Sequence, residues 1–295
     1  MLFNHGFQGK VIGDIGVLEY LNEVGLIVDV GAGYGGHILK YLDYVGPNNI
    51  YAFEPLPHNI DILRENVNAD INLFPFACGD RDKIVRFEIP DVTPIKGRRD
   101  RDGIRADYIG IGRVKDQNTP KNILLWFWRY FFRRGKSARK LRTIKVRQVR
   151  LDSILPLKRI SLLKIDVQGY EEKVLRGLGN RLQDIEIIYI EYSPFRKGAV
   201  IFLQENGFDI FDNKYIIFGP PNKEQYLRDR GFTNIFGFRN STGKYRYDCS
   251  LSEDLFDIDL FTYSLGNGFR VNETDLICMN NKFNLQDRLL DSIKD

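Results

Sequence analysis

The sequence predicts an α/β fold built around a mostly parallel β-sheet. Apolar runs of strand length alternate with segments of helical periodicity, and this alternation is typical of βα units. The first clear strand leads directly into a glycine-rich turn within VDVGAGYGGHILKYL, residues 28–42. Apolar residues make up 43% of the 295 residues and charged residues 28%, so wholesale disorder is excluded.

The predicted elements follow one another in two series. The first series opens with a helix that Asp14 caps and that reaches about Val24. It continues with strands at 26–30, 49–54, 71–77 and 83–89 and with helices at about 36–44 and 58–68. The second series has strands at 161–167, 185–192, 207–211 and 275–280 and helices at about 171–182 and 199–206.

Two stretches, about 91–147 and 213–273, do not fit this alternation. We interpret them as insertions into one domain that spans residues 1–295. Insertions beside the carboxyl end of a parallel sheet often build the substrate site. The second stretch is rich in Tyr and Phe, which suits either a lid that stacks on sugars or a lid with a small core of its own.

The composition also predicts where the protein works. The N-terminus lacks a basic region followed by an apolar one, and no apolar run reaches the roughly 18 residues of a spanning helix. Cys78, Cys249 and Cys278 are too few and too scattered for a disulfide framework. A cytoplasmic protein is therefore expected, and peripheral contact with a membrane is left open.

The positive charge is concentrated in one segment. Residues 121–150 contain eleven Lys and Arg and no acid, and subtracting these from the net charge of +4 leaves −7 for the rest. Residues 120–134 have the caps of a helix, with a basic stripe opposite Leu and aromatic residues. The segment 120–147 could lie on an anionic membrane, pack on the domain or in a homodimer, or bind a polyanion. Nucleic acid is not expected as the substrate because no recognition motif accompanies the charge.

The glycine turn predicts a nucleotide-type cofactor without identifying it. Gly31, Gly33 and Gly35 allow a tight turn and close approach of a ligand. Gly31, Gly33 and Gly36 also match the dinucleotide fingerprint G-x-G-x-x-G. Either cofactor would use an acid at the end of the second strand, here Glu54, to accept hydrogen bonds from ribose hydroxyls.

Asp29 favours one of the two cofactors. A carboxylate beside a pyrophosphate would repel it, whereas a cofactor with a cationic amino-acid end and no phosphate would be attracted. S-adenosylmethionine is such a cofactor. The alternatives are an acid that is merely tolerated beside a structural turn and a nicotinamide dinucleotide.

Several motifs resemble the FkbM family of methyltransferases in order and spacing. They are DVGAGYG (29–35), YAFEP (51–55), ACGD (77–80), RLDSIL (150–155), LLKIDVQGYEEKVLRG (162–177) and YIEYSP (189–194). The stretch KIDVQGYE is the specific signal, because the glycine motif is common to most class I methyltransferases. The family usually has a glutamate where this chain has Gln168, whereas Asp166 and Glu171 are retained.

The resemblance implies a Rossmann-like class I methyltransferase fold. Its sheet has seven strands with the last one antiparallel, and helices cover both faces. The implied activity is S-adenosylmethionine-dependent methylation of a hydroxyl, commonly on glycan sugars or secondary metabolites. The implied cofactor-binding residues are Asp29, Gly31, Ala32, Gly33, Tyr34, Glu54 and Asp80. Asp80, after the third strand, would lie near the adenine, or it is only a turn residue.

The resemblance and the topology also predict the catalytic side chains. Asp166 ends one central strand and Glu191 ends its neighbour, so both carboxylates would reach the carboxyl edge of the sheet. Asp166 would act as base, or as ligand of a divalent metal, with Glu191 as its partner. Alternatively, Asp166 caps the following helix and Glu191 pairs with Lys164 or an arginine.

Three functions remain open at this point. The first is an S-adenosylmethionine-dependent O-methyltransferase that acts on a sugar hydroxyl of a glycan or glycosylated metabolite. The second is an NAD-dependent oxidoreductase. The third is an inactive protein that binds S-adenosylmethionine and serves as a membrane or polyanion adaptor.

Overall fold

The computed structural model describes residues 13–90, 97–100, 103–106, 113–114, 141–192, 197–212, 232–239, 245–251 and 274–285. The chain divides into two compact units. One unit comprises residues 23–185, and the other comprises residues 1–22 together with 186–295.

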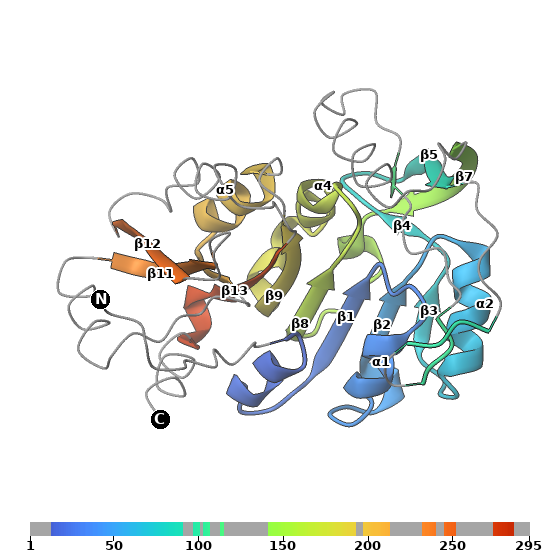
Figure 1. The fold of residues 1–295 in the computed structure, drawn as a ribbon, viewed down its shortest axis with the longest axis horizontal. Helices are drawn as coiled ribbons and strands as arrows, with labels where there is room; N and C mark the ends of the chain where they lie inside the picture. Colours follow the sequence, from blue (N-terminus) through green and yellow to red (C-terminus); the bar gives the residue numbers. More distant parts are fainter. Residues whose placement is uncertain are drawn as a thin grey trace. The chain divides into compact units, whose positions relative to one another are not determined.

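Four parallel strands form the centre of the unit 23–185 (Figure 1). They are β1 (Leu26–Val30), β2 (Ile50–Phe53), β3 (Asn72–Phe74) and β8 (Ile160–Ile165). β1 pairs in parallel with β2 and with β8, and β2 pairs in parallel with β3. Every residue of β1 and β8 is buried, as expected for the continuous apolar runs LIVDV and ISLLKI.

The helices of this unit are short. They are α1 (Gly36–Tyr41), α2 (Pro57–Asn66) and α4 (Glu171–Arg176), with 3₁₀ turns at Pro47–Asn49, Leu151–Ser153 and Gly179–Asp184. α2 begins with a proline, whose fixed φ suits the first position of a helix. Its buried side chains include Ile60, Ile62 and Leu63.

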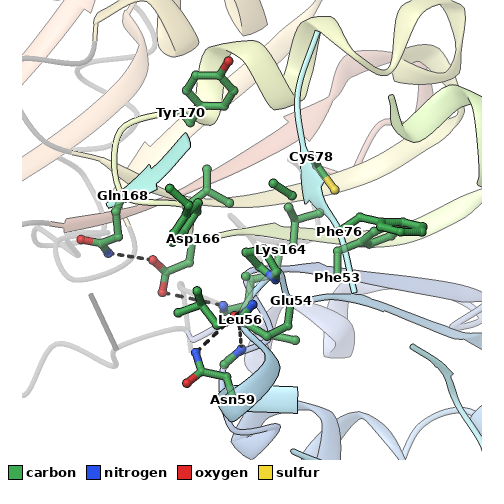
Figure 2. A pocket seen from close by; sticks show the side chains of 18 of the residues that line it. Phe53, Glu54, Leu56, Asn59, Phe76, Cys78, Lys164, Asp166, Gln168 and Tyr170 are labelled. Carbon is green, nitrogen blue, oxygen red and sulfur yellow. Dashed lines mark hydrogen bonds and ion pairs between the residues drawn. The ribbon is translucent and has the colours of Figure 1, made fainter. Parts of the chain in front are cut away.

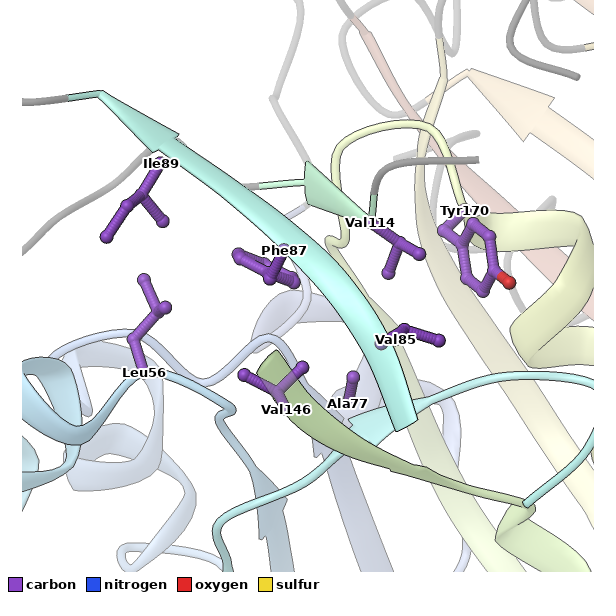
Figure 3. Close-up of a cluster of buried hydrophobic side chains, with 8 residues drawn as sticks. All are labelled: Leu56, Ala77, Val85, Phe87, Ile89, Val114, Val146 and Tyr170. Carbon is purple, nitrogen blue, oxygen red and sulfur yellow. The ribbon is translucent and has the colours of Figure 1, made fainter. Parts of the chain in front are cut away.

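A second sheet of four strands belongs to the same unit. Its order is β4 (Ala77–Cys78), β7 (Leu141–Val149), β5 (Lys83–Pro90) and β6 (Arg113–Val114). β5 is antiparallel to both of its neighbours, and β4 is parallel to β7. One face of this sheet contributes to an apolar cluster with side chains from outside it (Figure 3), and the cluster comprises Leu56, Ala77, Val85, Phe87, Ile89, Val114, Val146 and Tyr170.

The other unit contains β9 (Ile185–Tyr192) from Glu186 onward, β13 (Thr274–Asn280) and β10 (Phe208–Asp212), with α5 (Lys197–Glu205) between β9 and β10 in the sequence. β13 is antiparallel to both β9 and β10. β11 (Phe232–Arg239) and β12 (Tyr245–Leu251) pair as a separate antiparallel ribbon. A 3₁₀ turn at Gly16–Tyr20 comes from the N-terminal part of this unit, and another at Asn281–Phe283 follows β13.

The strand order of the main sheet is β10-β13-β9-β8-β1-β2-β3. The predicted α/β fold with seven strands, mostly parallel and with the last strand of the chain antiparallel, is therefore confirmed.

Three predicted elements differ from the structure. The helix expected from Asp14 to Val24 is only a 3₁₀ turn at Gly16–Tyr20, because glycines at positions 13 and 16 are poor helix formers. The strand expected at 71–77 is two strands of different sheets, separated by Pro75, which cannot donate a ladder hydrogen bond. The helix expected at 171–182 ends at Arg176 and is followed by a 3₁₀ turn that begins at Gly179, whose φ is +49°.

Both predicted insertions are described only in part. The stretch 91–147 includes β6 and most of β7, and the stretch 213–273 includes β11 and β12. The helix expected at 120–134 lies outside the described residues. Within the part of the chain that the structure describes, no helix is long and apolar enough to cross a membrane.

Candidate functional site

A cavity lies where β1, β2 and β8 end, and all of its lining residues belong to the unit 23–185 (Figure 2). Parallel strands present their carboxyl ends at one edge, and this edge is where open α/β sheets bind ligands. The glycine turn, the end of β2 with the start of α2, the segment after β8, and the second sheet all contribute to the lining.

Backbone N–H groups of the glycine turn form hydrogen bonds with residues at the end of β2. The N–H groups of Gly31 and Ala32 both donate to the carbonyl oxygen of Phe53, at 2.9 and 3.1 Å. The N–H of Gly33 donates to Oε2 of Glu54 at 3.0 Å. At Gly31, φ is +90°, and a Cβ atom would lie 2.0 Å from the carbonyl oxygen of Asp166, so only glycine fits.

Glu54 is buried beside this turn, with 4% of its surface exposed. Its Oε1 accepts hydrogen bonds from the N–H of Leu56 at 3.0 Å and from Nδ2 of Asn59 at 3.2 Å. Burial raises the pKa of Glu54 to about 7, and this effect outweighs the hydrogen bonds, which lower it. The carboxyl group is therefore close to half ionised at neutral pH.

Asp29 is fully buried in β1 and is not one of the residues that line the cavity. Its register partner on β8 is Lys164, whose Nζ lies 3.4 Å from Oδ1 of Asp29. The same Nζ lies 3.9 Å from Oδ2 of Asp166. Because Lys164 balances the charge of Asp29, that charge alone no longer discriminates against a pyrophosphate.

Asp166 directly follows β8 and lines the cavity, with 42% of its side chain exposed. Nε2 of Gln168 donates to Oδ1 of Asp166 at 3.0 Å. Gln168 has φ of +56°, an uncommon conformation for a residue with a side chain, and such positions cluster at functional sites. Asp166 does not cap the following helix, because the N-cap residue of α4 is Tyr170.

Besides Asp29, two of the predicted site residues do not line the cavity. Asp80 follows β4 rather than β3, and its Oδ2 accepts a hydrogen bond from Arg81 at 3.2 Å. Burial acts to raise the pKa of Asp80, but Arg81, Lys173 and Lys83 together hold it below the ordinary value. Glu191 is half-buried on β9, opposite Asp275 of β13, in the unit that does not contain the cavity.

Of the predicted residues, Gly31, Ala32, Gly33, Tyr34, Glu54 and Asp166 line the cavity together. The lining also includes side chains that the sequence did not single out as part of the site: Asn59, Phe76, Cys78, Phe87, Val114, Lys164, Gln168 and Tyr170. Lys164 and Gln168 lie within two residues of Asp166 in the sequence. This proximity is the sequence feature that could have assigned these two residues to the site.

The second sheet supplies an apolar wall. Ala77 and Cys78 from β4, Phe87 from β5 and Val114 from β6 line the cavity, together with Phe76. The ring of Phe76 lies 6.4 Å from that of Phe74, and the guanidinium of Arg147 lies 4.8 Å from its centre. A flat aromatic ligand would find apolar contacts here.

The residues present fit S-adenosylmethionine by their chemistry. A buried carboxylate can accept from ribose hydroxyls, a glycine turn allows close approach, and an apolar wall can contact an adenine ring. Among the described residues, no group of three or more His, Cys, Asp or Glu side chains is placed to hold a metal ion.

Comparison with known proteins links the chain to methyltransferases. The family model described as "Methyltransferase FkbM domain" matches residues 29–233. The 2-O-methyltransferase NoeI of Sinorhizobium fredii is 29% identical over 174 residues, which cover 57% of this chain and 63% of that relative, so the match spans less than two thirds of it.

The chain also aligns with solved structures of methyltransferases. Methyltransferase FkbM from Methylobacillus flagellatus aligns over 64% of this chain and 40% of its own, with 12% identity and a TM-score of 0.37. Precorrin-6y C5,15-methyltransferase from Geobacter metallireducens aligns over 90% and 88%, with 11% identity and a TM-score of 0.38.

Proposed function

Because the chain belongs to the FkbM family of methyltransferases, we propose that it is an S-adenosylmethionine-dependent O-methyltransferase. We propose a sugar hydroxyl, in a glycan or a glycosylated metabolite, as the acceptor. The name of the relative NoeI, a 2-O-methyltransferase, supports transfer to oxygen.

The hydrogen bonding of the glycine turn is the observation that carries the choice of cofactor. A pyrophosphate needs N–H donors from such a turn. The N–H groups of Gly31, Ala32 and Gly33 donate instead to Phe53 and Glu54, and the Glu54 carboxyl group occupies the place beside Gly33. This arrangement favours a cofactor without phosphates over NAD.

Under this proposal, Glu54 accepts hydrogen bonds from the ribose hydroxyls, and Asn59 keeps the carboxyl group oriented. The wall of Phe76, Ala77 and Cys78 contacts the adenine, and residues 31–34 contact the methionine end. Asp29 acts through its ion pair with Lys164, and Asp80 remains a proposed neighbour of the adenine. When bound, S-adenosylmethionine supplies an electrophilic methyl group.

Asp166 is the proposed general base. It lines the cavity, is accessible, and is oriented by Gln168 and by the nearby charge of Lys164. Its carboxylate would take the proton of the acceptor hydroxyl, and such a base typically contributes 10²–10⁴-fold to the rate. Glu191 stays a proposed partner of Asp166, and a divalent metal stays a proposed aid to deprotonation.

The first test is calorimetric titration of the protein with S-adenosylhomocysteine and, separately, with NAD. We expect only S-adenosylhomocysteine to bind, and Glu54→Ala to weaken its binding at least tenfold because two ribose hydrogen bonds are lost. Asp61→Ala is the matched control, since Asp61 is an exposed acid on α2, the helix that follows Glu54. Binding of NAD alone, or no effect of Glu54→Ala, would refute the cofactor assignment.

A second test separates an enzyme from an inactive adaptor. Sugar nucleotides and lipid-linked glycans are screened as acceptors with S-adenosylmethionine carrying a labelled methyl group. For an acceptor found in this way, Asp166→Asn should reduce transfer by 10²–10⁴-fold and leave the affinity for S-adenosylhomocysteine within about twofold. Equal transfer by Asp166→Asn would remove Asp166 from the mechanism.

A further inference from the structure

The four-stranded sheet has two different faces. Val85, Phe87 and Val146 point inward and are buried, and Phe87 lines the cavity. Because side chains alternate along a strand, the intervening residues of β5 and β7 point to the opposite face. Five of these are exposed: Ile84, Arg86, Thr143, Lys145 and Arg147. We call four of them, Ile84, Arg86, Lys145 and Arg147, the basic face.

The pairing within the basic face is unfavourable for an isolated sheet. Arg86 lies directly opposite Lys145 across the antiparallel ladder, and like charges in this position repel each other. Among the described residues, no carboxylate forms an ion pair with either side chain. The acid next along this face of β5, Glu88, is buried and has contacts of its own.

An exposed apolar side chain accompanies these cations. Ile84 has 64% of its surface exposed and lies directly opposite Arg147. A bound anion would relieve the repulsion between Arg86 and Lys145, but a soluble polyanion would leave Ile84 in water. An anionic lipid surface would do both, since its headgroups contact cations while its apolar layer accepts Ile84.

We propose that the basic face binds the surface of an anionic membrane. The segment 121–150, which contains Lys145 and Arg147, carries eleven cations, and the rest of the chain has a net charge of −7. By its charge, an anionic surface would therefore attract the segment that contains Lys145 and Arg147 more strongly than the rest of the chain. Arg147 also contacts Phe76, which lines the cavity, so a docked lipid surface would lie beside the wall of the site.

The test is co-sedimentation of the full chain with large vesicles of phosphatidylglycerol and, separately, of phosphatidylcholine. We expect binding to the anionic vesicles only. Each cation near a lipid surface contributes about fivefold to the partition coefficient, so Arg86→Gln with Lys145→Gln should lower binding about 25-fold. Ile84→Ser should also weaken binding to these vesicles.

Matched controls are available within the same unit. Arg64→Gln with Lys158→Gln removes one exposed Arg and one exposed Lys elsewhere, and Leu157→Ser removes a leucine that is 92% exposed. Both controls should keep full binding, and circular dichroism checks that every variant is folded. Because no cofactor takes part, the result does not depend on the proposed enzymatic function.

Heparin distinguishes a membrane from a soluble polyanion. Failure to bind phosphatidylglycerol vesicles would overturn the proposal, and so would equal losses in the control variants. Binding to heparin with no effect of Ile84→Ser on the vesicles would also overturn it, because the basic face would then recognise charge alone.

Discussion

Glu54 links the turn, α2 and the cavity through one carboxyl group. It accepts from Gly33 N, Leu56 N and Asn59 Nδ2, yet its burial raises its pKa to about 7. The free protein therefore holds this group partly protonated at neutral pH. Ribose hydroxyls that donate to the carboxylate would favour its ionised form, so cofactor binding and proton release should be coupled.

This coupling predicts how the affinity for S-adenosylhomocysteine depends on pH. With a pKa of about 7 in the free protein, most Glu54 side chains are protonated at pH 6 and ionised at pH 8. If only the ionised form binds, the affinity should be about tenfold weaker at pH 6 than at pH 8. Calorimetry at both values measures this difference.

Glu54→Gln is the control for this prediction, because an amide keeps the shape of the side chain and does not titrate. Its affinity, although lower, should change little between pH 6 and pH 8. Repeating the titrations at pH 7 in buffers of different ionisation enthalpy counts the protons released. A tenfold pH effect that persists in Glu54→Gln would assign the coupling to another group.

The ion pair of Asp29 with Lys164 is a contact between side chains that the sequence alone does not predict. The sequence shows a carboxylate in an apolar strand, but the pairing depends on the register of β1 against β8, which are separated by more than 100 residues. The same holds for the wall residues Phe87 and Val114, because segments distant in the sequence bring them to the cavity.

At the scale of elements, burial decided which strands could be predicted. β1 and β9 were predicted to their ends, since both are long apolar runs bounded by turn residues. β7 was not predicted, because its buried Val146 and half-buried Ile144 alternate with Lys145 and Arg147 inside a strongly basic segment. From the sequence alone, we interpret this segment by its positive charge. The alternation of apolar and charged residues is the better signal, because it is typical of a strand with one buried face.

The glycine turn after β1 should not tolerate a side chain at position 31. An alanine at position 31 would have to keep φ at +90° and place its Cβ 2.0 Å from the carbonyl oxygen of Asp166. We expect Gly31→Ala to lower the free energy of unfolding by more than about 3 kcal/mol, since the backbone of Asp166, directly after β8, would have to move. Urea unfolding of the variant measures this loss.

Gly46→Ala is the matched control for the turn. Gly46 has φ of −65° and ψ of 152°, which alanine adopts readily, and an added Cβ would meet no atom within 4 Å. The control should be neutral or up to about 1 kcal/mol more stable. Equal stability of Gly31→Ala and the wild type would show that the turn tolerates a side chain beside Asp166.

At the scale of the whole molecule, the position of the cavity within one of the two compact units predicts which amides exchange more slowly when a ligand binds. All lining residues lie between Val30 and Tyr170, so they belong to the unit 23–185. A ligand at one hundred times its dissociation constant stabilises the form that binds it by about 2.7 kcal/mol. Amides that exchange only when this unit opens should then exchange up to about a hundredfold more slowly.

Hydrogen exchange of the intact chain, followed by mass spectrometry with and without S-adenosylhomocysteine, tests this distribution. We expect slower exchange in peptides covering residues 31–36, 54–59 and 166–170, and unchanged exchange in β9 and β13. Glu54→Ala should lose the effect at the same ligand concentration. Protection that extends to β9, where Glu191 lies, would show that cofactor binding alone couples the two units and would support a shared role of Glu191 with Asp166.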